Sequence, residues 1–538
     1  MSSSLPAQDG PAWPDLLNVS PQRAVDGRAL ERVLAFAFLA GDDGGVLVGA
    51  LDSCPLAFST FEGALFAREL FLEELLQGVL APRVNGRPLA FDADHVLRLL
   101  THPPRSAELI TFRGEASREL VEQPALRAAA ERLALAIQEL RRLFAGEGRV
   151  GIRGEQARRR IDILRAIEQL FAGMDAFAPA QSSLERIARF GSEVRASEGF
   201  HKLSELLRYE NARAYADLTL QLGADGSVRG LRVNQLREDA NNVYHVSSLR
   251  QWLGRAWLWL KGYRVTDGEL IDGWLDAVFQ GVVTFLPPLV QLLGDLEFLL
   301  CGVALVERAR ERGLAMSLPQ FTDDDWGVQQ LFNPLLLSSV QPVPCSLAIE
   351  PGTTLITGPN SGGKTRLLQA LGLTQLLAQS GLYVPAAQAR LPRVPGIFAS
   401  LSQPAGAEQA EGRLGSELLR IRMLFERAQP GSLVLVDELC SGTSPSEGEE
   451  LFQLVLELMQ ELSPRAFVST HFLKLAAAMA ESSELTLRFV QVELDARERP
   501  TYRFVRGVAE TSLARQTAAR LGVTREELRA LIAGRRQS

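Results

Sequence analysis

A glycine-rich octet in the C-terminal half of the chain carries the residue types that bind nucleotide phosphates. It fits the pattern G-x-x-x-x-G-K-[S/T] and contains Lys364, one of only four lysines among 57 basic residues. Such a site needs a compact ammonium, which arginine does not easily replace. Lys364 should reach the β- and γ-phosphates, and the Thr365 hydroxyl should bind Mg²⁺. The sequence therefore predicts an ATP-binding loop made of Gly358, Pro359, Asn360, Ser361, Gly362, Gly363, Lys364 and Thr365.

Two carboxylates and a histidine further along the chain would complete a hydrolytic site. Asp437 and Glu438 follow the apolar run 432–436, and His471 follows the run 467–470. We expect Asp437 to bind Mg²⁺ together with the loop threonine, and Glu438 to orient or deprotonate the attacking water. A lone histidine after a strand is more often structural, but this order of motifs favours contact of His471 with the γ-phosphate. The predicted catalytic residues are Lys364, Glu438 and His471.

Strands and a helix must hold these residues in place. The β-branched and apolar run 353–357 predicts a buried strand, and the leucines that follow Lys364 recur near helical spacing. Strand, glycine-rich loop and helix is the arrangement in which a helix N-terminus meets a phosphate. From about residue 329 to the C-terminus, strand and helix patterns alternate, which predicts an α/β domain.

The segments before this domain have different patterns. Residues 1–90 mix short apolar runs with glycine, and we expect a small mixed unit with a disordered start. Residues 91–325 are largely helical in pattern, apart from a two-residue alternation near 216–236 that predicts a β-hairpin. A Pro- and Asp-rich stretch, 319–326, marks a linker to the α/β domain, 326–538. The predicted fold is therefore multidomain, an α-helical core followed by a C-terminal α/β domain.

Net charge limits the kind of partner. The formal net charge is −7, so no global basic field attracts nucleic acid. The densest basic cluster leaves two interpretations open, a solvated helical face or a surface that contacts phosphates. Its members are Arg141, Arg142, Arg149, Arg153, Arg158, Arg159, Arg160 and Arg165.

Cysteine spacing and hydropathy bear on location. The four cysteines form no C-x-x-C pair, which is typical of a reducing cytoplasm and predicts neither a zinc site nor a disulfide framework. The longest apolar region, 274–306, contains Pro287, Pro288, Asp295 and Glu297. These residues favour a buried helical pair over a membrane span. We therefore expect a cytoplasmic protein without a membrane role.

Four motifs, in order, resemble the MutS mismatch-repair family. Residues 357–364 resemble its T-G-P-N-x-G-G-K loop, 377–386 its L-A-Q-x-G-x-x-V-P-A helix end, 437–444 its D-E-x-x-x-G-T-S segment and 470–471 its T-H element. The resemblance implies a helical core and lever region followed by an ABC-type P-loop ATPase domain that uses ATP and Mg²⁺. It also implies a homodimer, paired through the ATPase domain and a helix–turn–helix at residues 512–532.

The chain departs from the mismatch sensors of that family. Residues 1–90 stand where those proteins carry a mismatch-reading domain and a connector, and the hairpin near 216–236 resembles an abbreviated DNA clamp. Ser441 replaces the arginine of the acidic motif, and the nearest candidate for the signature serine lies in 412–417. Phe332-Asn333-Pro334 replaces Arg-His-Pro. Gln379-Ser380-Gly381 and Pro445-Ser446-Glu447-Gly448 resemble the second bacterial MutS branch, which lacks the mismatch-reading domain. That branch usually ends in a Smr nuclease domain, which we do not expect here.

Two functions follow from the resemblance. The first is a dimeric ATPase that couples ATP binding and hydrolysis to clamping on mismatched or branched double-stranded DNA, with mismatch-repair or recombination proteins as partners. The alternative is an ATP-gated scaffold that acts on a protein or a ribosome/RNA partner without mismatch recognition, which the negative charge and short hairpin favour. A small-molecule kinase fits poorly, because it leaves the long helical region without a role.

Overall fold

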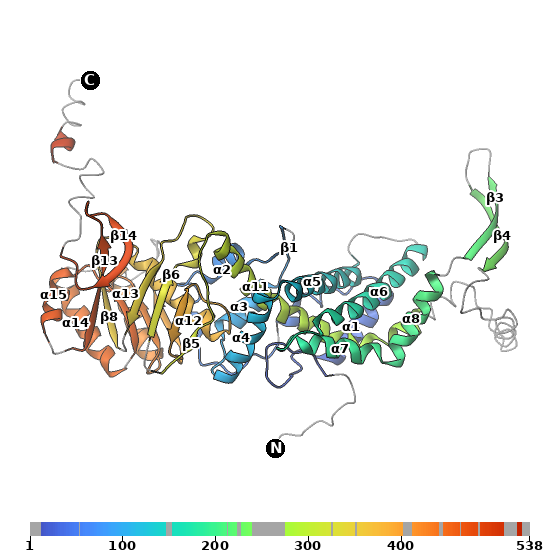
Figure 1. The fold of residues 1–538 in the computed structure, drawn as a ribbon, viewed down its shortest axis with the longest axis horizontal. Coiled ribbons are helices and arrows are strands. Elements are labelled where there is room, and N and C mark those ends of the chain that lie inside the picture. The colour runs from blue at the N-terminus through green and yellow to red at the C-terminus, as the bar shows by residue number, and fades with distance from the viewer. Residues whose placement is uncertain are drawn as a thin grey trace, which may run out of the picture. The chain divides into compact units, whose positions relative to one another are not determined.

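The computed structural model forms two compact units, each drawn from separate stretches of the sequence (Figure 1). We call the first the helical unit; it takes its described residues from 1–16, 21–54 and 125–293. We call the second the sheet unit; it takes its described residues from 17–20, 55–124 and 294–538. The structure describes residues 12–52, 54–84, 86–146, 153–211, 214–222, 228–238, 275–323, 326–349, 352–401, 412–440, 445–462, 464–482, 485–510 and 525–529.

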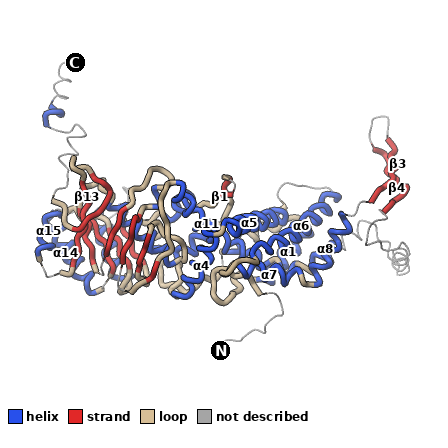
Figure 2. The backbone as a smooth tube through the Cα atoms, in the orientation of Figure 1, coloured by secondary structure: helices blue, strands red, loops and turns tan. Residues whose placement is uncertain are grey.

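Helices dominate the helical unit (Figure 2). Its main elements are α1 (Gly27–Ala40), α5 (Pro124–Ala145), α6 (Arg153–Gly173), α7 (Glu185–Arg195), α8 (Glu198–Asn211), the strands β3 (Ala214–Leu222) and β4 (Val228–Glu238), and the start of α11 (Pro287–Glu311). The antiparallel pairing of β3 with β4 confirms the predicted hairpin. The tight turn expected at Asp225-Gly226 lies outside the described residues.

Phenylalanine rings join the helices of this unit. Phe38 of α1 stacks on Phe279, with ring centroids 4.0 Å apart and an interplanar angle of 3°. Phe171 of α6 meets Phe190 of α7 and Phe200 of α8 edge to face, at 5.8 and 6.0 Å. Each ring removes a large apolar area from water, and ring pairs in these orientations add a further stabilisation of roughly 0.5–1.5 kcal/mol. The helical unit therefore has its own aromatic core.

Part of the predicted basic cluster stabilises this unit from within. The Arg159 guanidinium donates hydrogen bonds to the carbonyl oxygens of Ala37 and Phe38, both at 2.8 Å, where α1 ends. Arg160 is buried, with its guanidinium 5.7 Å from the centroid of the Phe38 ring. Arg142 pairs with a glutamate one turn away. Arg159 thus caps a helix and Arg160 packs on a ring, whereas Arg142 forms an exposed surface pair, and these contacts explain part of the cluster without a phosphate partner.

A six-stranded sheet forms the centre of the sheet unit. Its strand order is β10-β11-β12-β8-β13-β14, and only the β13–β14 pair is antiparallel. The strands are β8 (Thr353–Thr357), β10 (Ile397–Ser400), β11 (Leu433–Val436), β12 (Arg465–Ser469), β13 (Leu487–Leu494) and β14 (Pro500–Arg506). Every residue of β8 and β11 is buried, as expected for central strands of a parallel sheet covered on both faces.

Helices cover both faces of this sheet. They are α12 (Lys364–Gln379), α13 (Gly412–Arg427), α14 (Pro445–Glu461) and α15 (Leu473–Glu481). Figure 1 shows α12 on one side and α14 with α15 on the other. Gly372 lets α12 approach closely, because a Cβ there would lie 2.7 Å from side-chain atoms of Leu435 and Leu70. The predicted α/β alternation is thus present, and residues 525–529 add one helical turn, while the rest of the expected helix–turn–helix lies outside the described residues.

The described residues of the stretch 319–326, which the sequence suggested as a linker, instead contribute to a second sheet. This sheet has the order β5-β9-β6-β7, with β5 (Gln320–Phe321), β6 (Trp326–Leu331), β7 (Cys345–Ile349) and β9 (Gln388–Leu391). Backbone pairing of β5 with β9 and burial of Trp326 against the Phe467 ring, 5.1 Å between centroids, hold the stretch in place. The stretch resembled a linker in composition because β5 is only two residues long, and the residues around it are rich in Pro and Asp.

The apolar region 274–306 forms buried helices over its described residues, as predicted. Its prolines do not interrupt a helix, because Pro287 and Pro288 begin α11, where a missing N–H costs nothing. By length and composition α11 could cross a membrane, but its most apolar window is wholly buried inside the protein. Glu297, also buried, accepts a hydrogen bond from the Asp92 backbone N–H at 2.9 Å. A core helix accounts for this region.

Residues 1–90 do not follow the single small unit that we expected, because their described parts are divided between the two units. Residues 55–124 join the sheet unit through α2 (Leu72–Leu75), the short strands β1 (Arg83–Val84) and β2 (Arg87–Pro88), α3 (Ala93–Thr101) and α4 (Ala107–Glu122). The Ser117 hydroxyl of α4 donates to the Gly381 carbonyl just beyond α12, at 2.9 Å. These short apolar runs are too few for a separate core, and they complete the cores of other segments.

The aromatic stack in the helical unit gives a direct test of the packing. Phe38→Ala should lower the free energy of unfolding of this unit by about 3–5 kcal/mol, because it removes a fully buried ring and leaves a cavity. Phe36→Ala, on the same helix but 64% exposed, should change it by less than about 0.5 kcal/mol. Urea unfolding followed by circular dichroism measures both, and equal effects would contradict the packing described here.

Candidate functional site

The glycine-rich loop, residues 358–363, connects β8 to α12 at the carboxyl edge of the sheet. Gly358 has φ 135°, and a Cβ there would lie 2.7 Å from a methyl carbon of Val492 on β13. Gly363, the N-cap of α12, has φ 90° and offers no side chain to the first backbone N–H groups of the helix. Those N–H groups and the positive end of the helix dipole therefore remain available to an anion.

The Lys364 side chain is folded back over the loop. It is only 5% exposed, and its Nζ donates to the carbonyl oxygens of Gly358 and Pro359 at 3.1 and 3.3 Å. Its nearest described carboxylate is that of Glu438, with Oε1 3.9 Å from Nζ. Burial lowers the pKa of the Lys364 ammonium, whereas Glu438 and Asp437 act to raise it. The Lys364 ammonium is thus held by neutral carbonyl oxygens, and a phosphate oxygen would be a stronger partner for it.

Asp437 and Glu438 follow β11, and the parallel register brings them to the same edge as the loop. Val436 pairs with Val468, so the next residues of β11 and β12 are neighbours. The Thr365 hydroxyl donates to Asp437 Oδ2, and the Ser469 hydroxyl donates to Asp437 Oδ1. Residues from the first turn of α12 and the ends of two strands therefore meet at one carboxylate.

This pair of oxygens fits a magnesium ion that is shared with a phosphate. Thr365 and Asp437 supply hard oxygen ligands, which Mg²⁺ prefers, and they already lie in direct contact. Among the described residues, no group of three or more His, Cys, Asp or Glu side chains could hold a metal. Mg²⁺ in nucleotide sites is usually bound through one or two carboxylates plus substrate phosphates, so the residues present suit that group.

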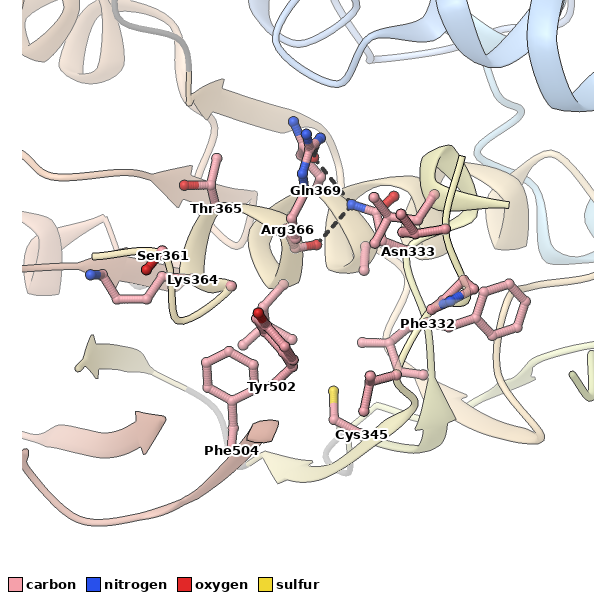
Figure 3. Close-up of a pocket in the computed structure, with 18 of the residues that line it drawn as sticks. Phe332, Asn333, Cys345, Ser361, Lys364, Thr365, Arg366, Gln369, Tyr502 and Phe504 are labelled. Carbon is pink, nitrogen blue, oxygen red and sulfur yellow. Dashed lines mark hydrogen bonds between the residues drawn. The ribbon is translucent and has the colours of Figure 1, made fainter. Parts of the chain in front are cut away.

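A cavity of about 810 Å³ opens beside the loop (Figure 3). Lys364, Thr365 and Glu438 lie on its wall, and aromatic and apolar side chains line the rest, with contributions from Phe332, Val340, Val343, Tyr502 and Phe504. Tyr502 of β14 is 50% exposed and has φ 61°, unusual for a residue with a side chain. The cavity lining combines charged and polar side chains with apolar ones, as ligand pockets commonly do.

Tyr502, Phe504 and Asn333 are residues whose place in the site the sequence did not predict. Asn333 Nδ2 donates to the Arg366 carbonyl at 3.0 Å and to Gln369 Oε1 at 3.1 Å, both on α12 (Figure 3). The amide thereby attaches the segment around Asn333 to α12, the helix that follows the loop. Tyr502 and Phe504 of β14 lie more than a hundred residues beyond the loop in the sequence. Aromatic residues at alternate positions of a strand do not by themselves indicate a ligand site.

His471 lies apart from these groups in the described structure. β12 ends at Ser469, and the His471 side chain is exposed, with its ring 4.2 Å from that of Phe472. It does not line the cavity. Its contact with a γ-phosphate therefore stays a prediction. The motif residues Ser441 to Ser444 lie outside the described residues.

Comparison with known proteins identifies the domain that carries this site. Residues 354–527 match the family model of MutS domain V, the ATPase domain of MutS proteins. Similar curated proteins are named endonuclease MutS2, from Thermus thermophilus (35% identical over 245 residues, 45% of this chain and 32% of that protein), Pelotomaculum thermopropionicum (39% over 198 residues, 36% and 25%) and Streptococcus mutans (35% over 240 residues, 43% and 29%).

The chain thus aligns with about a third or less of the length of these relatives. The aligned part includes the loop, the acidic pair and the strands that hold them. These findings agree with the resemblance of the four sequence motifs. Residues 354–527 are therefore a MutS domain V, and the curated relatives that align with this part of the chain belong by name to the second branch of that family.

Proposed function

We propose that the chain binds ATP with Mg²⁺ in the cavity beside the glycine-rich loop and hydrolyses it to ADP and phosphate. The observation that carries the proposal is that Lys364, Thr365 and Glu438 line a cavity with aromatic walls, while Asp437 contacts the Thr365 hydroxyl beside it. Separate stretches of sequence supply the cation, the metal ligands and a carboxylate that a phosphoryl-transfer site requires.

Each residue has a distinct part in this proposal. Backbone N–H groups of the loop and of the first turn of α12 bind the β- and γ-phosphates, and Lys364 exchanges its carbonyl partners for phosphate oxygens. Thr365 and Asp437 hold Mg²⁺, which neutralises charge that develops on the phosphate oxygens. Glu438 orients or deprotonates the attacking water. His471 contacts the γ-phosphate after a rearrangement of its exposed side chain.

The apolar end of the cavity suits the nucleoside. Tyr502 offers an exposed aromatic face close to Gly363, where a Cβ would lie 3.4 Å from its ring. Val340 and Val343, 52% and 42% exposed, lie on the same cavity wall. A base stacked among these side chains would cover them and leave its phosphates at the loop. The cavity therefore offers apolar side chains for the base of ATP and polar groups for its phosphates.

We further propose that the ATPase cycle controls a homodimer that clamps on mismatched or branched DNA in the cytoplasm. Family membership supports DNA binding, and the hairpin β3–β4 is the proposed abbreviated clamp. Dimerisation would occur through the ATPase domain and the helix–turn–helix predicted at 512–532. Mismatch-repair or recombination proteins would be the partners of this cycle.

A second candidate function remains, an ATP-gated scaffold for a protein or a ribosome/RNA partner. One observation favours it: Arg159 and Arg160, from the densest basic cluster, are engaged inside the helical unit. With a net charge of −7, the chain offers no compensating global attraction for DNA. Both candidates use the same ATP site and differ in the macromolecule that the ATP state controls.

Lys364→Ala tests the nucleotide site. We expect it to weaken ATP binding by about 10- to 100-fold, because it removes a charged hydrogen bond to the phosphates, and to abolish measurable hydrolysis. Lys474→Ala is the matched control, since it removes an exposed lysine of α15, and it should behave like the wild type. Calorimetric titration and phosphate release measure both, and normal turnover by Lys364→Ala would refute the assignment.

Glu438→Gln separates binding from hydrolysis. ATP affinity should stay near that of the wild type, while turnover should fall by about 10²- to 10⁴-fold, since an amide cannot accept a proton from water. The variant should accumulate the ATP-bound dimer, detectable by light scattering after size-exclusion chromatography. Glu450→Gln, at an exposed position of α14, provides the control. Wild-type turnover in Glu438→Gln would exclude Glu438 as the water-positioning group.

Salt dependence distinguishes the two candidate functions. Binding of the ATP-bound protein to homoduplex, mismatched and branched DNA, and to RNA, should be compared at two salt concentrations. The clamp proposal expects affinity for branched or mismatched DNA that falls steeply with salt, because phosphate contacts release counterions. Absence of DNA binding even at low salt would contradict it and favour the scaffold.

A further inference from the structure

We propose that Ser469 is a positioning residue that holds both acidic residues of the candidate site, Asp437 by its carboxylate and Glu438 by its backbone. The inference rests on the proposed ATPase function and adds a residue to which the sequence motifs gave no role of its own. Ser469 does not reach substrate in this account. It acts through the two carboxylate residues that would.

The position of Ser469 in the sheet makes this possible. It is the last residue of β12, which lies between β11 and β8. On one side its register partner is Ile356, the second-last residue of β8, and on the other side the acidic pair follows the end of β11. The side chain is fully buried. A buried hydroxyl at this point must find its partners within the protein.

Two hydrogen bonds use the hydroxyl as both donor and acceptor. Ser469 Oγ donates to Asp437 Oδ1 and accepts the backbone N–H of Glu438 at 3.0 Å. A hydroxyl has a single proton, so the bond to Asp437 fixes its direction and leaves its lone pairs for the N–H. Ser469 Oγ therefore fixes the position of Asp437, the proposed metal ligand, relative to Glu438, the residue proposed to orient water.

The bond to Asp437 orders its carboxylate. With Oδ1 held by Ser469, the other oxygen, Oδ2, is the one that accepts the Thr365 hydroxyl. The carboxylate cannot rotate without breaking one of these contacts. Groups that orient a metal ligand in this way typically change metal affinity or activity by about 10- to 100-fold when they are removed.

The bond to Glu438 supports an unfavourable backbone conformation. Glu438 has φ 49°, in the left-handed region that residues with side chains rarely adopt. This turn aims its carboxylate toward Lys364, with 3.9 Å between Oε1 and Nζ. Such conformations persist only where the surroundings fix them, and the N–H bond to Ser469 is one such constraint.

Ser469→Ala is the primary test, read out by Mg²⁺-dependent binding of a fluorescent ATP analogue as well as by turnover. We expect kcat to fall by about 10- to 100-fold and the Mg²⁺ concentration for half-maximal binding to rise by about tenfold or more. Binding without Mg²⁺ should stay within about threefold of the wild type, because the loop and Lys364 are untouched. Ser432→Ala removes an equally buried serine at the other end of β11 and should leave both readouts unchanged.

Conservative variants separate the hydroxyl from simple packing. Ser469→Thr keeps the hydroxyl and should recover most of the lost Mg²⁺ response. If Ser469→Ala does not fold, Ser469→Cys replaces it, since a thiol has nearly the same shape but is a weak donor, and it should also need more Mg²⁺.

The outcomes distinguish this inference from the proposed function. A folded Ser469→Ala or Ser469→Cys protein with the wild-type Mg²⁺ requirement and turnover would overturn the role of Ser469 alone. Equal losses in the Ala and Thr variants would overturn it too, because packing would then be responsible. A wild-type chain that binds Mg²⁺-ATP without hydrolysing it would contradict the proposed catalysis, while the Mg²⁺ titration would still decide the role of Ser469. A wild-type chain that binds no ATP would overturn both.

Discussion

The parallel register of β8, β11 and β12 is the constraint on which the candidate site depends. Their carboxyl ends share one edge of the sheet, so the glycine-rich loop, the acidic pair and Ser469 meet although they lie far apart in sequence. Because side chains alternate along a strand, a slip of one residue in β11 would turn Asp437 away from Thr365. The backbone pairing of β11 with β12 and of β12 with β8 holds this register in the structure.

The two units use their charged residues differently. In the sheet unit the charged residues of the loop and the strand ends gather at the cavity: Lys364 and Glu438 line it, and Asp437 contacts Thr365 on its wall. In the helical unit Arg159 and Arg160 are engaged with backbone carbonyls and an aromatic ring. A concentration of arginine in the sequence is therefore weak evidence for a nucleic-acid surface, because guanidinium groups also terminate helices and cover rings.

The sequence predicted the features that depend on local chemistry. The strand–loop–helix around Lys364, the acidic pair after β11 and the hairpin β3–β4 all follow from short-range patterns, and the structure contains each of these elements. What it did not predict depends on contacts between distant segments. The wall formed by Tyr502, the division of residues 1–90 between two units and the role of Ser469 arise from packing and register, which no single segment encodes.

The most direct test of the central claim is an experimental structure of the chain with Mg²⁺ and a non-hydrolysable ATP analogue. The account predicts phosphates along the loop, Lys364 Nζ transferred from the Gly358 carbonyl to a phosphate oxygen, metal between Thr365 and Asp437, and the base beside Tyr502. A nucleotide bound elsewhere, or an unoccupied cavity at saturating analogue with Lys364 still on the Gly358 carbonyl, would contradict it.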